Sequence, residues 1–370
     1  MKKVRLILLW TAVCAVAALT ALTPARNTDA LREELVRSRY GGWAGVLRLW
    51  LPEAWTDDGL TAWLNGCIAA FEKGHRGVYI QLTEVSKEAL RGFAAGPATP
   101  PDLLICPPGL LANPEGLLTL PDDAPLRPGL EACGVTEGGR FALPVAVGAY
   151  GLVYNRAALE SLPAAWRDLP QAPTLKGCAY WLNWPADGEY LRWSQAMGDL
   201  LADAPPGEAT PETPRAGEGL DVGLPVAGAA LLPEAIPADF GRQASVYKPF
   251  VNGEIAAIPV TPREIHRLTQ LSDTGRGPDW AVAPRTSTYT DQLALLAVTD
   301  CPSSDRAERQ ALCLEFAALL LEKESQAKLT RARLFPVIQM PPIYASSAGM
   351  AQLEAGLSGL TMRPERAFGG

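Results

Sequence analysis

The first third of the chain alternates short apolar runs with stretches of helical period, and no other feature constrains the fold as strongly. Three apolar runs have the length of a strand, at residues 46–51, 78–82 and 102–106. The intervals between them carry apolar side chains at the spacing of one helix face, over residues 60–72 and 87–95. This order of strand, helix, strand, helix and strand predicts a parallel sheet with helices on its faces.

Ligands of such sheets bind beyond the carboxyl ends of the strands. Residues 52–55 follow the first predicted strand, and residues 107–110 follow the third. We therefore expect these two segments to line a cleft.

The stretch 141–155 is the apolar region that decides how many domains the chain has. It combines branched and aromatic residues with Gly148 and Gly151, which predicts two short strands joined at a flexible point. Two interpretations are open: a strand pair inside one domain, or a chain that leaves one domain and enters another. The length of 370 residues favours two domains, at about 150 residues for each.

A second α/β unit is expected downstream, with the chain returning to the first unit at about residues 285–300. Strands are predicted at residues 178–184, 255–260, 280–284 and 293–298, and helices at residues 157–166, 190–202, 263–271 and 306–329. Residues 204–219 are rich in Pro, Gly, Glu and Thr, which is typical of a loop.

The charge of the chain excludes some classes of partner. The formal net charge is −7 and there is no basic cluster. Nucleic acid and anionic lipid are therefore disfavoured as partners.

The N-terminus has the pattern of an export signal. Lys2, Lys3 and Arg5 precede residues 6–25, which carry no charge and are about long enough to span a bilayer. A cleaved signal peptide and an uncleaved membrane anchor both fit this pattern, and both fit better than lipidation of Cys14. In either case we expect an exported, extracytoplasmic body, membrane-tethered through residues 6–25 if the leader is not cleaved.

No motif of an enzyme, a cofactor site or a metal site is present. The sequence lacks GxSxG, HExxH, a Walker loop and a complete GxGxxG. It has two histidines, and its seven cysteines form no CxxC pair. We expect no catalysis, no cofactor and no metal, and we expect Cys67, Cys106 and Cys313 to act as small apolar side chains. Disulfides among the six cysteines outside the leader stay open.

Four stretches carry a resemblance to a known family. They are Leu49 and Trp50 with residues 69–73 and 78–80; residues 141–155; residues 250–257; and residues 316–321 with Ser325, Gln326 and residues 335–337. In this order they resemble the extracellular solute-binding proteins of ABC importers, in the carbohydrate family that includes maltose-binding protein.

The resemblance implies an α/β fold of two lobes, periplasmic-binding-protein-like and of type II, with a hinge and an interlobe cleft. The N-terminal hydrophobic helix would precede it. The implied division is residues 1–25 as leader, 26–42 as spacer, 43–143 and 287–335 as lobe I, and 144–286 and 336–370 as lobe II. The stretch 141–155 would be the first of three crossings between lobes, with Gly148 and Gly151 serving the hinge.

Six residues are candidates for ligand contact by their place in this pattern: Glu53, Trp55, Gly148, Tyr150, Trp184 and Arg263. Sugars present apolar faces to aromatic rings and hydroxyl edges to polar groups, and the chain has ten Trp and nine Tyr. The family's maltose-binding protein carries a glutamate where this chain has Gly148 and an aromatic residue where it has Arg263. These departures disfavour a maltose-like ligand and leave a smaller sugar, an anionic sugar or no ligand open.

The expected function is the capture of a small solute, with carbohydrate as the expected class, and its delivery to the permease subunits of an ABC importer by lobe closure. A monomer is expected. The alternative is a divergent, membrane-anchored relative that acts as a sensor or scaffold for a protein partner.

Overall fold

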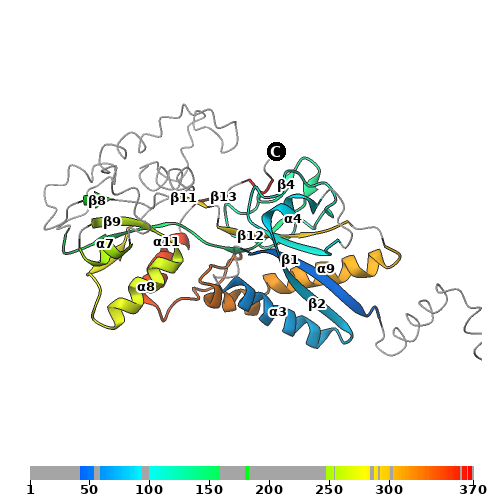
Figure 1. Ribbon diagram of the computed structural model, residues 1–370, viewed down its shortest axis with the longest axis horizontal. Coiled ribbons are helices and arrows are strands. Elements are labelled where there is room, and N and C mark those ends of the chain that lie inside the picture. Colours follow the sequence, from blue (N-terminus) through cyan, green and yellow to red (C-terminus); the bar gives the residue numbers. More distant parts are fainter. Residues whose placement is uncertain are drawn as a thin grey trace, which may run out of the picture.

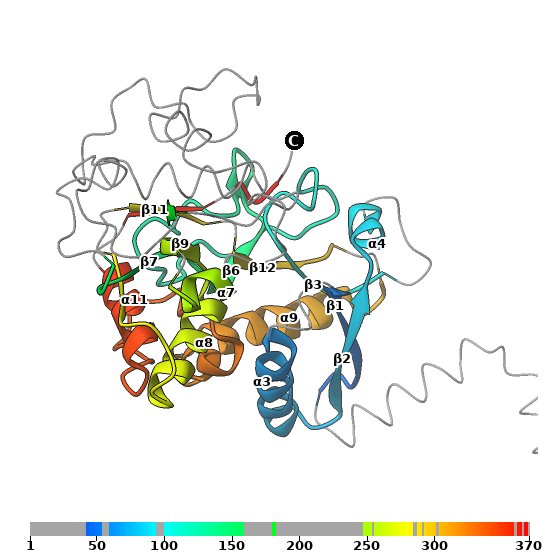
Figure 2. The same cartoon turned by 60° about the vertical axis from the view of Figure 1, so that its left-hand side comes forward.

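The strands of the chain divide into two main sheets, and the chain passes from one sheet to the other within residues 141–155. The computed structural model describes residues 42–53, 59–93, 100–158, 180–182, 247–253, 255–283, 287–290, 292–300, 303–358, 361–364 and 366–368. Figures 1 and 2 show two bodies side by side, each built from one sheet and its helices. The predicted leader and nearly all of the predicted spacer lie outside the described residues.

The first sheet has five strands in the order β2-β1-β3-β12-β6. Their bounds are β1 Gly45–Pro52, β2 Val78–Val85, β3 Leu103–Cys106, β6 Leu143–Val147 and β12 Leu293–Val298. β1, β2 and β3 are parallel, as predicted, but β12 runs antiparallel to both β3 and β6. The sheet is therefore mixed, because β12 starts at the edge where β1 and β3 end and has to run the opposite way.

The helices of the first lobe are α3 Leu60–Gly74, α4 Lys87–Arg91, α9 Arg306–Leu321, α10 Lys323–Ala327 and the 3-10 helix η5 Lys328–Ala332. α3 buries the apolar face that its period predicted. Its Phe71 packs edge to face on Phe316 of α9, with ring centroids 5.4 Å apart. Trp63 of α3 donates a hydrogen bond to the carbonyl of Ser325 at 2.8 Å. The two helices are thus fixed to each other and to α10.

The single long helix predicted over residues 306–329 is wrong. The helix stops at Leu321, and Glu322 adopts an extended conformation with φ −63° and ψ 144°. Helix then resumes in α10. Apolar periodicity continues through such a break, so the sequence pattern does not reveal it.

The second sheet has the order β10-β7-β9-β8. Its strands are β7 Gly151–Asn155, β8 Tyr180–Leu182, β9 Ile255–Val260 and β10 Trp280–Val282, and its helices are α7 Tyr247–Val251, α8 Pro262–Asp273 and α11 Ala348–Ser358. α11, which the sequence analysis did not predict, packs against α8 and β10. The helix predicted at 190–202 and the loop predicted at 204–219 lie outside the described residues, as does the helix predicted at 157–166 apart from its first two residues.

Two small sheets complete the described strands: β4 Val135–Thr136 with β5 Gly139–Arg140, and β11 Ser287–Thr290 with β13 Thr361–Pro364. After β13 the chain returns to the first lobe, where the N–H of Gly109 donates to the carbonyl of Ala367 at 3.0 Å. We expected residues 336–370 to belong to lobe II, which corresponds to the second sheet and its helices. Ala367 instead lies against lobe I, which corresponds to the first sheet and its helices. We also expected a boundary at 143–144, whereas β6 belongs to the first sheet as far as Val147.

One buried amide connects three parts of the first lobe. Gln326 has no exposed surface. It donates to the carbonyls of Val145 in β6 at 2.8 Å and Leu320 in α9 at 2.7 Å, and it accepts from the N–H of Val337 at 2.9 Å. The three bonds satisfy backbone groups that water cannot reach.

We predict that Gln326→Leu lowers the free energy of unfolding by at least about 3 kcal/mol, because it leaves three buried backbone groups unpaired at about 1–3 kcal/mol each. Urea unfolding followed by tryptophan fluorescence measures the loss. Gln310→Leu is the matched control, because the one hydrogen bond of the Gln310 amide within the described residues goes to the side chain of Asp300. Equal losses in the two variants would contradict a special role of Gln326.

Candidate functional site

The passage between the sheets is held by hydrogen bonds from both sides. Val147 and Phe335 exchange two backbone hydrogen bonds, of 3.1 and 2.7 Å. The N–H of Gly148 donates to the carbonyl of Gln292 at 2.6 Å, and the Thr290 hydroxyl donates to the carbonyl of Gly148 at 2.7 Å. Three chain segments therefore meet at Val147 and Gly148. We call this meeting point, formed by Val147, Gly148, Thr290, Gln292 and Phe335, the waist.

The two glycines of the passage are needed for space, and their role in the hinge stays a prediction. Neither Gly148 nor Gly151 has a positive φ. A Cβ on Gly148 would lie 2.3 Å from Oε1 and 2.7 Å from Cβ of Gln292, and one on Gly151 would lie 3.2 Å from Cγ2 of Val260. Close approach of neighbouring segments explains both positions.

The strand registers bring the ends of several strands to two facing edges. In the first sheet, Trp50 lies beside Leu104, so β1 and β3 end at the same edge, where β6 ends as well. In the second sheet, Gly151 lies beside Val260, so β9 ends where β7 begins. Both edges adjoin the waist, and the elements on either side of it are visible in Figure 2.

Four of the six predicted contact residues lie at these edges. Glu53 is exposed directly after β1, and Arg263 is exposed in the first turn of α8. Gly148 lies in the waist, and Tyr150 follows it with 2% of its surface exposed. A ligand reaches Tyr150 only if the segments that cover it move. Trp55 and Trp184 lie outside the described residues, and contact of any of the six with a ligand stays a prediction.

The start of α8 positions Arg263. Pro262 occupies the first turn, and Thr261 and Glu264 form a capping box in which the N–H of Thr261 donates to Glu264 at 2.9 Å. These bonds fix where the helix begins. They therefore fix the backbone that carries the Arg263 guanidinium.

Thr290 and Gln292 are parts of the waist that sequence reasoning missed. They precede the apolar strand β12 and resemble an ordinary polar turn. Their significance comes from contact with Gly148, which is distant in the sequence, and no local pattern signals it.

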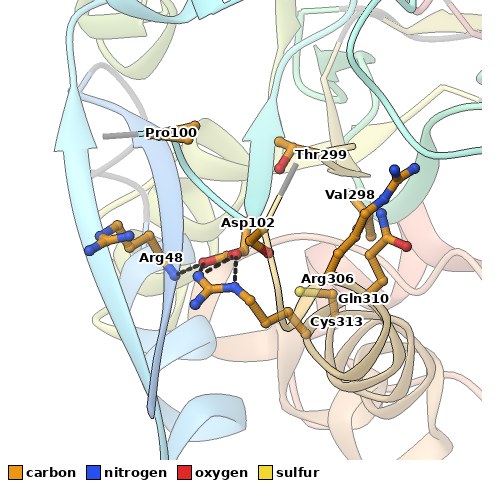
Figure 3. A pocket seen from close by; sticks show the side chains of 10 residues that line it. Arg48, Pro100, Asp102, Val298, Thr299, Arg306, Gln310 and Cys313 are labelled. Carbon is orange, nitrogen blue, oxygen red and sulfur yellow. Dashed lines mark hydrogen bonds and ion pairs between the residues drawn. The ribbon is translucent and has the colours of Figure 1, made fainter. Parts of the chain in front are cut away.

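Two cavities lie away from the facing edges. One, of about 170 Å³, opens at the amino end of β3, where Asp102 accepts hydrogen bonds from Arg309 at 2.6 to 2.9 Å and from the N–H of Arg48 at 2.7 Å (Figure 3). The other, of about 410 Å³, lies between the end of α8 and the start of α11. The carboxylate of the first cavity is already paired with arginine, which indicates a structural ion pair.

Cys67, Cys106, Cys133 and Cys313 are buried and unpaired. Burial raises the pKa of Cys106 and of Cys133 to about 12, which keeps both thiols protonated and unreactive. The residues that the structure describes include no group of three or more His, Cys, Asp or Glu side chains that could hold a metal ion.

The family model of the bacterial extracellular solute-binding proteins matches residues 67–354. The chain belongs to this family. The match covers the second sheet, the waist and all strands of the first sheet except β1.

Solved structures of sugar-binding proteins share the fold. A cyclic alpha-maltosyl-1,6-maltose binding protein from Arthrobacter globiformis has a TM-score of 0.62 and 15% identity, over 88% of this chain and 90% of that chain. The sugar-binding protein MalE from Xanthomonas citri has a TM-score of 0.63 and 16% identity, over 87% of each chain. A sugar transporter from Rhizobium etli, in an open conformation, has a TM-score of 0.62 and 16% identity, over 87% and 90%. A comparison with curated proteins gave no significant match.

These similarities establish a two-lobed, periplasmic-binding-protein-like fold. Within the described ranges, no helix has both the length and the apolar character that a membrane span requires.

Proposed function

We propose that this protein captures a carbohydrate between its two lobes outside the cytoplasm and delivers it to the permease subunits of an ABC importer. The observation that carries the proposal is the waist, where three segments cross between two sheets whose strand ends face each other. A hinge closure requires this arrangement, because the lobes can turn about a narrow line of crossings while each sheet stays rigid.

The class of solute is inferred from the structural neighbours, which are described as binders or transporters of sugars. The contact residues of the proposed site are Glu53, Trp55, Gly148, Tyr150, Trp184 and Arg263. Membership of a solute-binding family supports solute capture over the sensor or scaffold alternative, and over catalysis.

Export is proposed to depend on the apolar stretch of residues 6–25. Mass spectrometry of the exported protein distinguishes a cleaved leader from a retained anchor. An intact protein that stays in the cytoplasm would contradict the proposal.

We predict that at least one saccharide in a panel of neutral and acidic mono- and oligosaccharides raises the melting temperature. A ligand at 100 times its Kd stabilises the folded state by about 2.7 kcal/mol. Thermal shift followed by calorimetry measures the effect. A panel without any shift would overturn the proposed function.

Arg263→Ala should raise the Kd of that saccharide about tenfold or more, because a guanidinium at the facing edge donates several hydrogen bonds to hydroxyl or carboxylate groups. Arg276→Ala is the matched control, because Arg276 is an exposed arginine beyond the opposite end of α8. If both variants bind like the wild type, Arg263 is not a contact, although solute capture as such would stand.

A further inference from the structure

The side chain of Gln292 occupies the space in which a side chain of residue 148 would lie. A Cβ on Gly148 would be 2.3 Å from Oε1, 2.7 Å from Cβ and 3.1 Å from Cδ of Gln292. The two positions therefore share one site in the waist, and the residue that fills it is Gln292.

The backbone of Gln292 is fixed on both sides. Its carbonyl accepts from the N–H of Gly148 at 2.6 Å, and its own N–H donates to the Thr290 hydroxyl at 3.1 Å. A fixed backbone limits the positions that the amide can reach, so the amide is held near Gly148.

The amide of Gln292 has hydrogen-bonding capacity that the described residues do not use. It forms no hydrogen bond with the residues that the structure describes, and the side chain is partly buried. A primary amide offers two donors and an acceptor, and these groups are open to a ligand. Gln292 directly precedes β12, whose first residue Leu293 lies beside Val147 at the facing edge. A solute between the lobes would meet this amide.

We infer that Gln292 is a specificity-determining contact, which hydrogen-bonds a hydroxyl group of a neutral saccharide. The inference rests on the proposed function. An uncharged group that both donates and accepts suits a hydroxyl group.

The test compares Gln292→Met with the wild type, using the neutral saccharide that binds best. Met keeps the length of the side chain and removes the donors and the acceptor. We expect the Kd to rise at least tenfold, which corresponds to about 1.4 kcal/mol. Gln81→Met is the control, because Gln81 is exposed on β2, away from the waist, and it should leave the Kd unchanged.

Monodeoxy analogues of the same saccharide separate a ligand contact from a packing role. For the wild type, one analogue should have a higher Kd than the parent saccharide. For Gln292→Met, that same analogue and the parent saccharide should have equal Kd values. A Kd for Gln292→Met within twofold of the wild type, or equal sensitivity of both proteins to every analogue, overturns the inference. A wild type that binds no saccharide overturns the proposed function and the inference together.

A different observation concerns residues 361–364 and 366–368, which follow α11 of the second lobe and contact the first lobe. β13 pairs in parallel with β11 over four residues, next to the waist. The chain then forms the Gly109–Ala367 hydrogen bond, and Leu111 and Phe368 form a parallel bridge. Ala367 is 8% exposed, and Phe368 packs against the core. The preceding helix α11 packs on α8 in the second lobe.

The geometry points to a strap, formed by residues 361–364 and 366–368, that restrains the angle between the lobes. Gly109 and Leu111 follow β3 at the facing edge, so a change in lobe angle would strain or break the bonds that Ala367 and Phe368 form there. The strap is independent of the identity of the solute.

Deletion of residues 361–370 should raise the radius of gyration of the ligand-free protein, because the lobes can then open further. Small-angle scattering measures this change, although the loss of ten residues would by itself lower the radius slightly. Phe368→Ser, which weakens the contact with lobe I alone, should also raise the radius of gyration. An unchanged radius of gyration in both variants would overturn the inference that the strap restrains the angle between the lobes. Tyr79→Ser is the control, because Tyr79 is exposed on β2, away from the strap contacts, and it should leave the radius of gyration unchanged.

Discussion

The fold depends on the hydrogen bonds that hold Val147 and Gly148 between two other segments of the chain. Phe335 lies on one side, and Thr290 and Gln292 lie on the other. Backbone N–H and carbonyl groups that are buried at such a point need hydrogen-bond partners, and here each segment provides partners for the segment beside it. The waist therefore fixes the relative positions of three crossings, although they are far apart in the sequence. Each sheet can then be built as a separate rigid unit on its own side.

The region behind the waist is fixed by buried side chains that bond to backbone. Gln326 connects β6, α9 and Val337, and Glu354 of α11 accepts from the N–H groups of Ile343 and Tyr344 at 2.9 Å each. The hydroxyl of Tyr344 donates to the carbonyl of Leu334 at 2.9 Å. Four of these bonds hold residues 334–344, next to the third crossing between the sheets, which passes through Phe335 of the waist. The third crossing is held by these bonds, and the first crossing is closely packed around Gly148. The motion that this architecture permits is therefore a rotation of whole lobes.

Much of the fold could be predicted from the sequence, because the strands and helices of residues 45–106 and the two strands of residues 141–155 have strong local periods. The antiparallel course of β12, the break at Glu322 and the return of Ala367 to the first lobe depend on contacts between distant segments, which no local pattern encodes. The candidate site divides in the same way. Strand ends indicated where Glu53 and Arg263 would lie, whereas Gln292 could not be recognised without the structure, because only its packing on Gly148 distinguishes it from a polar turn residue.

We propose that the lobes turn about the waist to enclose a solute. The most direct test is a pair of crystal structures, without solute and with the saccharide that binds best, superposed on the first sheet. We predict that the Cα atom of Arg263 moves towards that of Glu53, while the two hydrogen bonds between Val147 and Phe335 persist. Lobes that keep one angle in both structures, or a waist whose hydrogen bonds break on binding, would contradict it.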